Sequence, residues 1–455
     1  MITYIYIDGF KSFRDFEMYF CPLTVVAGVN ASGKSNLFDA MQLLSSLSQG
    51  EKLANAMRSS RGEDDELFLQ YHDESRAQTM TFKVDMLLKP HVQDEWGMEC
   101  DIKFTRLRYE LQIMRSTETS RQYKIAYESL TPILRKDDVW LKSYPPKIIE
   151  KICPKIAKAR MRPFLETTND ANEIKIVVPG EETGSKKREY SMKEAYCTIL
   201  SRFTKIDDAH IMAARQELAQ WMFLQLEPKA LRQPTEKSES GHGLLPDGRR
   251  LANVVNDLKN EDPYNMKVIG RMVNKFMPNL VAVDVIDDKE NMRYVLRMQD
   301  KNGRWYSSRV LSEGTLRVLA LCVLAVDNRH QSLLCFEEPE NGVHPQRVAK
   351  MAELVRELSA DFSLEHPTLR QAIVNTHSPL FVQAVDEMDS SYMQLCLSRM
   401  VPAVDNIDDR RLKYSKTRIL PYIKDGKEPL LGYSKQDLKL SAYDIMKYLT
   451  NNEAE

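Results

Sequence analysis

A glycine-rich segment at residues 28–35 carries the most specific chemistry in the chain. It reads Gly-Val-Asn-Ala-Ser-Gly-Lys-Ser and fits the pattern G-x-x-x-x-G-K-[ST]. The apolar run Leu23–Ala27 precedes it and an amphipathic run over residues 34–47 follows, which predicts a strand, a loop and a helix. Glycines let successive backbone N–H groups face phosphate oxygens, and the helix start adds a positive end. The pattern therefore predicts a phosphate-binding loop.

Within this phosphate loop, residue types predict separate roles. We expect Lys34 to reach the β- and γ-phosphates of a nucleotide, and Ser35 to offer its hydroxyl to Mg²⁺. The alternative is a glycine-containing surface turn before a helix, and the strand, loop and helix context argues against it. The remaining members of the predicted nucleotide-binding set are Gly28, Asn30, Gly33 and Asn36.

A second motif is the apolar run at residues 331–339, which ends in two acids: Gln-Ser-Leu-Leu-Cys-Phe-Glu-Glu-Pro. Such a run is typical of a buried strand whose final carboxylates face a metal-bound nucleotide. We expect Glu337 to reach the Mg²⁺ shell and Glu338 to polarise the attacking water. The alternative is a buried strand that runs into a charged turn, and the phosphate loop makes it less favoured.

Two further segments are weaker on their own. Leu-Ser-Glu-Gly-Thr at residues 311–315 precedes an apolar helix, and Ser312 with the backbone of Gly314 would form an anion site at its N-terminus. An ordinary capped helix explains this pentapeptide alone better. His377 follows a predicted strand over residues 372–375, at the end of a strand where α/β sheets bind ligands. A histidine there is more often a cap or core residue.

Composition narrows the class of protein. The chain has 455 residues with 64 basic and 65 acidic side chains, so nucleic-acid binding would need a local patch. Seven scattered cysteines without a C-x-x-C spacing argue against a disulfide framework or zinc site and for a reducing cytosol. The first residues lack a signal-peptide pattern, and no apolar stretch reaches membrane-spanning length. We therefore expect a cytoplasmic protein without a membrane partner.

The elements that position these motifs divide into five segments. Residues 1–50 and 245–385 are expected to form the two parts of the nucleotide-binding domain, and residues 51–130 an antiparallel β lobe. Residues 131–244 are predicted to be a mainly helical insertion, with helices over 147–162, 193–203 and 211–224 and a strand over Glu173–Val178. This insertion would offer a surface for a partner or nucleic acid. Residues 386–455 are a C-terminal extension, and no heptad run predicts a coiled-coil arm.

In this order the motifs resemble the ABC-type ATPase head, and more narrowly the RecF/SMC-related, OLD-like ATPases of bacteria. The opening residues 7–13, Ile-Asp-Gly-Phe-Lys-Ser-Phe, are similar to the start of SMC heads. Residues 337–345, Glu-Glu-Pro-Glu-Asn-Gly-Val-His-Pro, resemble the block that follows the catalytic strand in this group. The resemblance is strong over residues 1–50 and 245–385 and weak elsewhere. It implies an α/β fold, in which an ABC-ATPase head with an antiparallel β lobe carries a mixed α+β insertion.

The resemblance also implies roles for individual residues. Ser312 and Gly314 match the ABC signature, which contacts the γ-phosphate of ATP bound to the other subunit. Glu338 matches the catalytic glutamate and His377 the switch histidine, whereas Glu337 stands where most members have aspartate. Residues 340–344 match the D-loop region. Two basic residues match the part of the N-terminal lobe near the nucleotide, Lys11 and Arg14, and two candidates stand for the Q-loop glutamine, Gln70 and Gln78.

These matches imply an ATPase that binds ATP and Mg²⁺ between the copies of a homodimer or higher homo-oligomer. Only 78 residues follow His377, and no apolar strand there ends in D-x-D, so we expect no Toprim nuclease. The leading hypothesis is the ATPase subunit of a bacterial anti-phage system with a separate effector, a nuclease or toxin. The alternatives are an ATP-dependent scaffold with little turnover and a RecF-like repair ATPase. The second would bind DNA through basic clusters at Lys147, Lys151, Lys155, Lys158, Arg160 and Arg162, at Lys186, Lys187 and Arg188, and at Arg410, Arg411, Lys413, Lys416 and Arg418.

Overall fold

The structure is a computed structural model of the chain. It describes residues 1–116, 122–153, 162–170, 173–180, 186–238, 243–388, 392–407 and 410–422, together with Ile445, Tyr448 and Leu449. Within these ranges, no helix combines the length and the apolar character that crossing a membrane requires.

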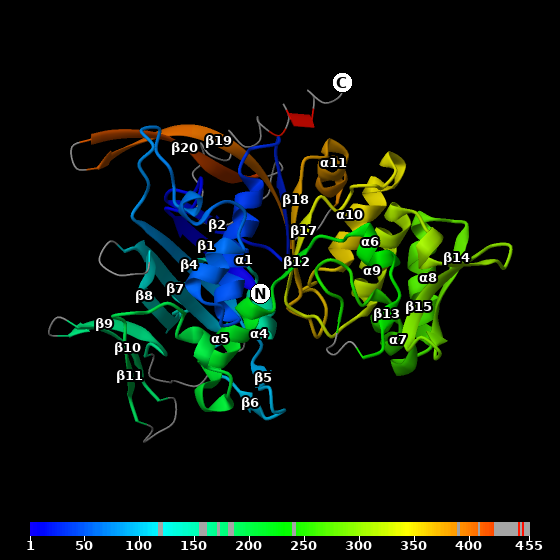
Figure 1. Cartoon of the computed structure of the whole chain (residues 1–455), viewed down its shortest axis with the longest axis horizontal. Helices are drawn as coiled ribbons and strands as arrows, with labels where there is room; N and C mark the ends of the chain where they lie inside the picture. The colour runs from blue at the N-terminus through cyan, green and yellow to red at the C-terminus, as the bar shows by residue number, and fades with distance from the viewer. Residues whose placement is uncertain are drawn as a thin grey trace.

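A mixed sheet built from distant parts of the sequence forms the centre of the molecule (Figure 1). All its strands but the last run parallel, and the central ones are mostly apolar because other elements cover both of their faces. Its order in the described residues is β12 (Met222–Leu224), β17 (Leu333–Glu337), β18 (Gln371–Thr376), β3 (Leu23–Ala27), β19 (Met393–Ile407) and β20 (Arg410–Tyr422).

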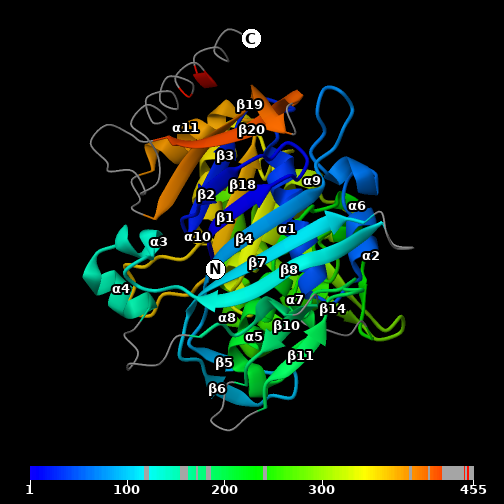
Figure 2. The same cartoon turned by 90° about the vertical axis from the view of Figure 1, so that its left-hand side faces the viewer.

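One face of this central sheet is covered by helix α1 (Lys34–Ser48) and an antiparallel β lobe (Figures 1 and 2). Alternating side chains of the lobe, such as Ile5 and Phe82, share a core with Leu37 and Leu44 of α1 and Val26 of β3. Helices α2 (Leu53–Arg58) and α5 (Ala209–Ala219) border it. The lobe strands, in spatial order, are β2 (Phe16–Tyr19), β1 (Ile2–Asp8), β4 (Thr79–Leu87), β7 (Arg106–Arg115) and β8 (Tyr123–Pro132).

The other face packs against helices that carry a small sheet at their far side (Figure 1). Val25 of β3 joins this second core, whereas its neighbour Val26 joins the first, so both faces of the strand are buried. The helices are α6 (Pro228–Arg232), α7 (Leu251–Glu261), α8 (Tyr264–Phe276), α9 (Glu313–Val326), α10 (Val348–Glu357) and α11 (Pro379–Glu387). The small sheet contains β13 (Thr235–Glu236), β14 (Leu280–Asp288), β15 (Arg293–Asp300) and β16 (Trp305–Ser307).

The α/β fold class that the resemblance implied is confirmed, with a phosphate-loop sheet, an antiparallel lobe and a mixed insertion. Where it is described, the insertion combines helices with short strands. Besides α5, α6, β12 and β13, its elements are α3 (Val139–Lys142), α4 (Pro146–Ile152), β9 (Glu166–Asp170), β10 (Glu173–Val178) and β11 (Arg188–Ser191). A further hairpin, β5 (His91–Gln93) with β6 (Glu99–Asp101), leaves the lobe.

The helix predicted over residues 193–203 is wrong. The segment contains turns and a 3₁₀ turn at Leu200–Arg202. Its backbone N–H groups at Ile199 and Leu200 donate to the buried carboxylate of Glu128, at 2.8 and 2.9 Å. The carbonyl of Tyr196 accepts from the N–H of Leu53. Because these groups bond to other elements, they do not form the hydrogen bonds of a helix.

Three other expectations are corrected in part. The helix predicted over residues 211–224 ends at Ala219, and Met222–Leu224 becomes edge strand β12 because it pairs with β17. The basic helix predicted over 147–162 ends at Ile152, and residues 154–161 lie outside the described residues. The extension after residue 385 is not separate from the nucleotide-binding sheet, since β19 pairs with β3.

Candidate functional site

The parallel strands β17, β18 and β3 place the predicted motifs at one edge of the central sheet. Glu337 at the end of β17 is the register partner of Asn375, and Thr376 at the end of β18 is the partner of Ala27. The phosphate loop follows β3, two acids close β17, and His377 follows β18. Chain direction and sheet order thus bring together residues that are 302 positions apart, such as Ser35 and Glu337.

The phosphate loop has the backbone geometry of an anion site. Gly33 caps α1 in the left-handed region at φ 87°, and no side chain caps the free N–H groups of the first turn. A Cβ atom at Gly33 would lie 1.8 Å from the Thr417 hydroxyl, so only glycine fits. The N–H of Asn36 donates to the Gly33 carbonyl at 3.1 Å, whereas those of Lys34 and Ser35 bond to none of the described residues and remain available to phosphate oxygens.

Lys34 folds back onto its own loop. Its ammonium donates to the carbonyl oxygens of Gly28 at 2.7 Å and Val29 at 2.9 Å. Burial lowers the pKa of Lys34, and the carboxylates of Glu338 and Glu337 oppose part of that shift. A phosphate group at the loop would favour the charged form further, because it adds negative charge.

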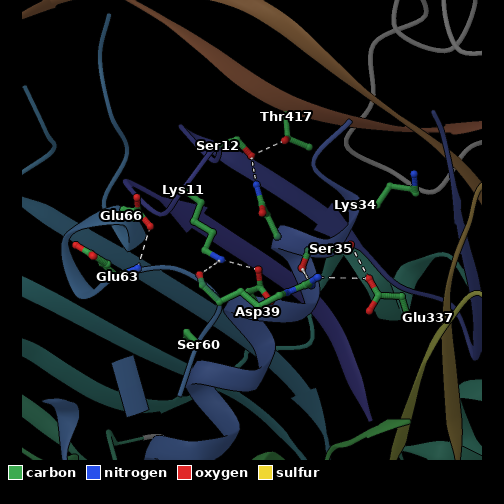
Figure 3. Close-up of polar contacts among 12 residues, drawn as sticks. Lys11, Ser12, Lys34, Ser35, Asp39, Ser60, Glu63, Glu66, Glu337 and Thr417 are labelled. Carbon is green, nitrogen blue, oxygen red and sulfur yellow. Dashed lines mark hydrogen bonds and ion pairs between the residues drawn. The ribbon is translucent and has the colours of Figure 1, made fainter. Parts of the chain in front are cut away.

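Ser35 and Glu337, the two predicted metal ligands, are in direct contact (Figure 3). The Ser35 hydroxyl donates to the Glu337 carboxylate at 2.6 Å. Mg²⁺ prefers oxygen ligands and keeps several from water and phosphate. The described residues contain no group of three or more His, Cys, Asp or Glu that could hold a metal alone. One hydroxyl and one carboxylate fit an ion that takes its other ligands from a nucleotide and water.

Glu338 has a strained backbone, and both of its carboxylate oxygens are hydrogen-bonded. Its backbone lies in the left-handed region at φ 52°, and its N–H donates to the carbonyl of Asn375 at 2.9 Å. One carboxylate oxygen lies 2.5 Å from Nδ1 of His377, and the other accepts from Asn341 at 2.7 Å. The predicted catalytic acid and switch histidine are thus hydrogen-bonded to each other.

A cavity of about 240 Å³ joins the phosphate loop to these acids. Asn30 and Asn36 both line it, and the Asn36 amide donates to the Ser12 hydroxyl at 2.7 Å. Polar side chains and backbone dominate its walls, as a triphosphate requires. The full lining is Asn30, Ala31, Ser32, Gly33, Lys34, Ser35, Asn36, Glu337, Glu338, Asn375 and Met400.

The predicted signature does not reach this cavity. Neither Ser312 nor Gly314 is among its lining residues. Ser312 caps α9, where its hydroxyl accepts from the N–H of Thr315 at 3.2 Å. A Cβ at Gly314 would lie 2.3 Å from the carbonyl oxygen of Gly342, so glycine permits close contact between this turn and the segment after β17.

The two basic residues assigned to the N-terminal lobe form ion pairs. Lys11 donates to the buried Asp39 of α1 at 2.6 Å (Figure 3). Arg14 pairs with Asp8 at 3.1 Å and with Asp405 of β19 at 2.7 Å. These contacts brace α1 and the hairpin β19–β20 against the lobe.

Sequence reasoning missed two polar residues of the site. Arg61 follows α2, donates to the carbonyl of Ser35 at 3.3 Å and lies 3.8 Å from Glu337. Gln225 directly follows β12 and lines a second cavity of about 530 Å³ with both acids of β17. Gln70 and Gln78, the two glutamines considered from the sequence, line neither cavity. The signal for Gln225 was the run Met-Phe-Leu-Gln at residues 222–225.

The chain was compared with known proteins and with solved structures. No curated protein matches the chain. The SMC head domain from Thermotoga maritima is 12% identical with a TM-score of 0.39, over 93% of this chain and 99% of that one. The Smc head domain with a coiled coil and joint from Pyrococcus yayanosii is 10% identical with a TM-score of 0.46, over 99% of both chains.

Two family models match the chain. One, described as "AAA domain, putative AbiEii toxin, Type IV TA system", matches residues 192–383, which contain the signature, both acids and His377. The other, described as "AAA ATPase domain", matches residues 1–240 of the 455, more than half of the chain, and contains the whole phosphate loop. The chain belongs to the AAA ATPase domain family.

Proposed function

We propose that the chain binds Mg·ATP at the phosphate loop and hydrolyses it slowly, within a dimer of two copies joined through the nucleotide. The observation that carries this proposal is the contact of Ser35 with Glu337 and of Glu338 with His377 beside the phosphate loop. Two side chains that would hold a metal ion and an acid–histidine pair thus lie beside one cavity, which supports the proposal.

Each side chain then has one task. Lys34 and the N-terminus of α1 bind phosphate oxygens, and Ser35 and Glu337 hold Mg²⁺, which neutralises phosphate charge when bound. Glu338 orients and deprotonates the attacking water. His377 fixes the Glu338 carboxylate and donates toward the γ-phosphate. The reaction transfers the γ-phosphoryl group to water and gives ADP and phosphate.

The direct test compares ATP turnover in the wild type and in Glu338→Gln. The variant keeps the shape of the side chain but loses the base, so turnover should fall roughly 10²–10⁴-fold while ATP still binds. Glu353→Gln, at an exposed position of α10, is the matched control and should leave turnover unchanged. Near-normal turnover in Glu338→Gln would exclude Glu338 as the catalytic carboxylate. A wild type that binds ATP without turnover would favour the scaffold alternative.

For the biological role, we propose the ATPase subunit of an anti-phage system that acts with a separate effector. The family description that names an AbiEii toxin and a type IV toxin–antitoxin system supports this role over residues 192–383. Co-purification of the full chain from cells that express its neighbouring genes would test it. Recovery of a nuclease or toxin at a fixed ratio would support it, and recovery of replication proteins alone would contradict it.

Direct nucleic-acid binding is a second candidate, favoured by charges on the hairpin β19–β20. Arg411 and Lys413 are exposed on one face, opposite Asn406 and Val404, and form no ion pair with any described residue. By contrast, Arg188 and Lys187 of another basic cluster pair with acids. Residues 155, 158 and 160 of the first cluster lie outside the described residues.

Fluorescence anisotropy with a labelled DNA duplex tests this candidate. The double variant Arg411→Ala/Lys413→Ala loses two phosphate contacts. The plot of log association constant against log salt concentration should therefore become less steep by about 2. Lys301→Ala/Arg304→Ala, in the exposed turn before β16, removes the same charge elsewhere and is the control. Equal weakening by both pairs would show that only net charge matters.

A further inference from the structure

The hairpin β19–β20 is built directly onto the phosphate loop. The Ser398 hydroxyl of β19 donates to the carbonyl of Ser32 at 2.8 Å. From β20, the N–H of Thr417 donates to the carbonyl of Ser12 at 2.8 Å, and the two hydroxyls lie 2.6 Å apart (Figure 3). The Thr417 side chain also fills the space that a Cβ at Gly33 would need. The hairpin therefore forms one wall of the nucleotide site.

Met400 is the residue by which this wall enters the cavity. It pairs with Thr417 across the hairpin, and its sulfur lies 3.3 Å from the Thr417 hydroxyl. Apart from Ala31, it is the one apolar side chain among the residues that line the phosphate-loop cavity as described. The residue remains 39% exposed, so it offers an accessible apolar surface.

The order of groups along the cavity indicates what Met400 would contact. Ser35 and Glu337 mark the end where Mg²⁺ and the γ-phosphate would bind. Asn36, one residue further along α1, is linked through Ser12 to Thr417 and so to Met400. In a nucleotide, the α-phosphate, the ribose and the base follow one another away from the γ-phosphate, so they would extend from the Ser35 side toward the Asn36 side of the loop. These contacts link Met400 to the Asn36 side of the loop, which is the side on which a base would leave it.

We propose that the hairpin supplies the base subsite, with the Met400 thioether packed against a purine ring. This rests on the proposed nucleotide binding. A thioether packs favourably against aromatic rings and has no hydrogen-bond pattern that reads the ring edge. The subsite therefore accepts adenine and guanine alike, and its contribution is absent for a ligand that consists of phosphates only.

Calorimetric titration with Mg·ATP, Mg·GTP and magnesium tripolyphosphate tests the subsite. Met400→Ala should weaken ATP and GTP by roughly 2- to 10-fold and leave tripolyphosphate unchanged. Met400→Leu should restore most of the loss because it restores the apolar contact. Val404→Ala removes an exposed apolar side chain from the same face of β19, away from the cavity lining, and is the matched control.

The outcomes separate the two proposals. If Met400→Ala weakens tripolyphosphate as much as ATP, Met400 acts through the shape of the loop and the base subsite is wrong. If it weakens neither ligand, the base lies elsewhere, and the subsite is equally wrong. If the wild type binds neither ATP nor tripolyphosphate, the proposed nucleotide binding fails and the subsite with it.

Discussion

Lys34 donates to the carbonyl oxygens of Gly28 and Val29, which belong to its own loop. A phosphate can replace both neutral acceptors with charged oxygens, so the hydrogen bonds of the lysine become stronger ones in which donor and acceptor are both charged. We expect Lys34→Ala to weaken ATP binding by roughly 10²-fold or more, since hydrogen bonds to charged groups contribute about 1.5–3 kcal/mol each. Titration of a fluorescent ATP analogue measures this, with Lys301→Ala as the control. Unchanged affinity would contradict the assignment of the phosphate loop.

The sequence alone predicts the positions of some site residues but not of others. The roles expected of Lys34, Ser35 and Glu337 come from short motifs. Within each motif, residues that are adjacent in sequence also lie together in the fold. Glu338 and His377 lie 39 positions apart, yet parallel strands end at a common edge, so their proximity could be expected. Arg61 and Met400 had no such local signal, and the apolar run before Gln225 is too short to mark a strand by itself, because each of these residues reaches the cavities from an element whose position depends on tertiary packing.

At the scale of elements, the hairpin and the phosphate loop should be coupled energetically. Gly33→Ala introduces a Cβ where Thr417 lies, and it also strains a backbone at φ 87°. Thr417→Gly removes the obstructing side chain. In a double-mutant cycle, the two losses of unfolding free energy should therefore fail to add, with a coupling of roughly 1–3 kcal/mol. Chemical denaturation measures the four proteins. The pair Gly33→Ala and Val404→Gly is the control and should add.

A second element-scale prediction concerns Glu128, which ties the insertion to the β lobe. It is fully buried and accepts from the N–H groups of Ile199 and Leu200 and from the Tyr109 hydroxyl. Burial raises its pKa from 4.5 to about 7. Between these two pH values, the Glu128 carboxyl therefore keeps a proton in the folded protein that it loses in the unfolded chain. Stability from this group is complete below the ordinary pKa and is lost as the pH rises through about 7.

Denaturation of the wild type and Glu128→Gln at about pH 5 and about pH 8 measures this contribution. The variant is destabilised by an amide that faces backbone donors, but it cannot titrate. The advantage of the wild type over the variant should thus shrink toward pH 8, by about 3 kcal/mol at most. Parallel pH curves for the two proteins would show that Glu128 has an ordinary pKa in the fold.

The same elements show where pattern reading failed. Strands β3, β17 and β18 and helix α1 have apolar patterns that match their burial, so they could be predicted. Residues 193–203 have a helical pattern, yet the Glu128 carboxylate binds their N–H groups. Strand β12 and the hairpin β19–β20 form because a sheet edge lies beside them. The periodicity of a sequence does not show which edge strand of a sheet is free to pair with a new strand.

At the scale of the whole molecule, we predict that the signature at residues 311–314 contacts a nucleotide bound to another copy of the chain. Ser312 is exposed, and neither it nor Gly314 lines the cavity of the phosphate loop. Two copies related by a two-fold axis would face each other and form two equal sites. We therefore predict that each ATP contacts Lys34 of one copy and Ser312 of the other.

Complementation tests this arrangement. Lys34→Ala and Ser312→Arg should each abolish ATP turnover alone, because every site then carries one lesion. In a mixed dimer, one site carries both lesions and the other carries none. With free exchange of subunits, half of the dimers in an equal mixture are mixed, so turnover should return to about a quarter of the wild-type value. The control mixes the wild type with the double variant, whose mixed dimers would contain two damaged shared sites, so only its wild-type dimers would turn over and about a quarter of the wild-type value should remain. If the control instead keeps about half of the wild-type value while the mixture of single variants stays inactive, each site lies within one copy and the shared-site arrangement is wrong.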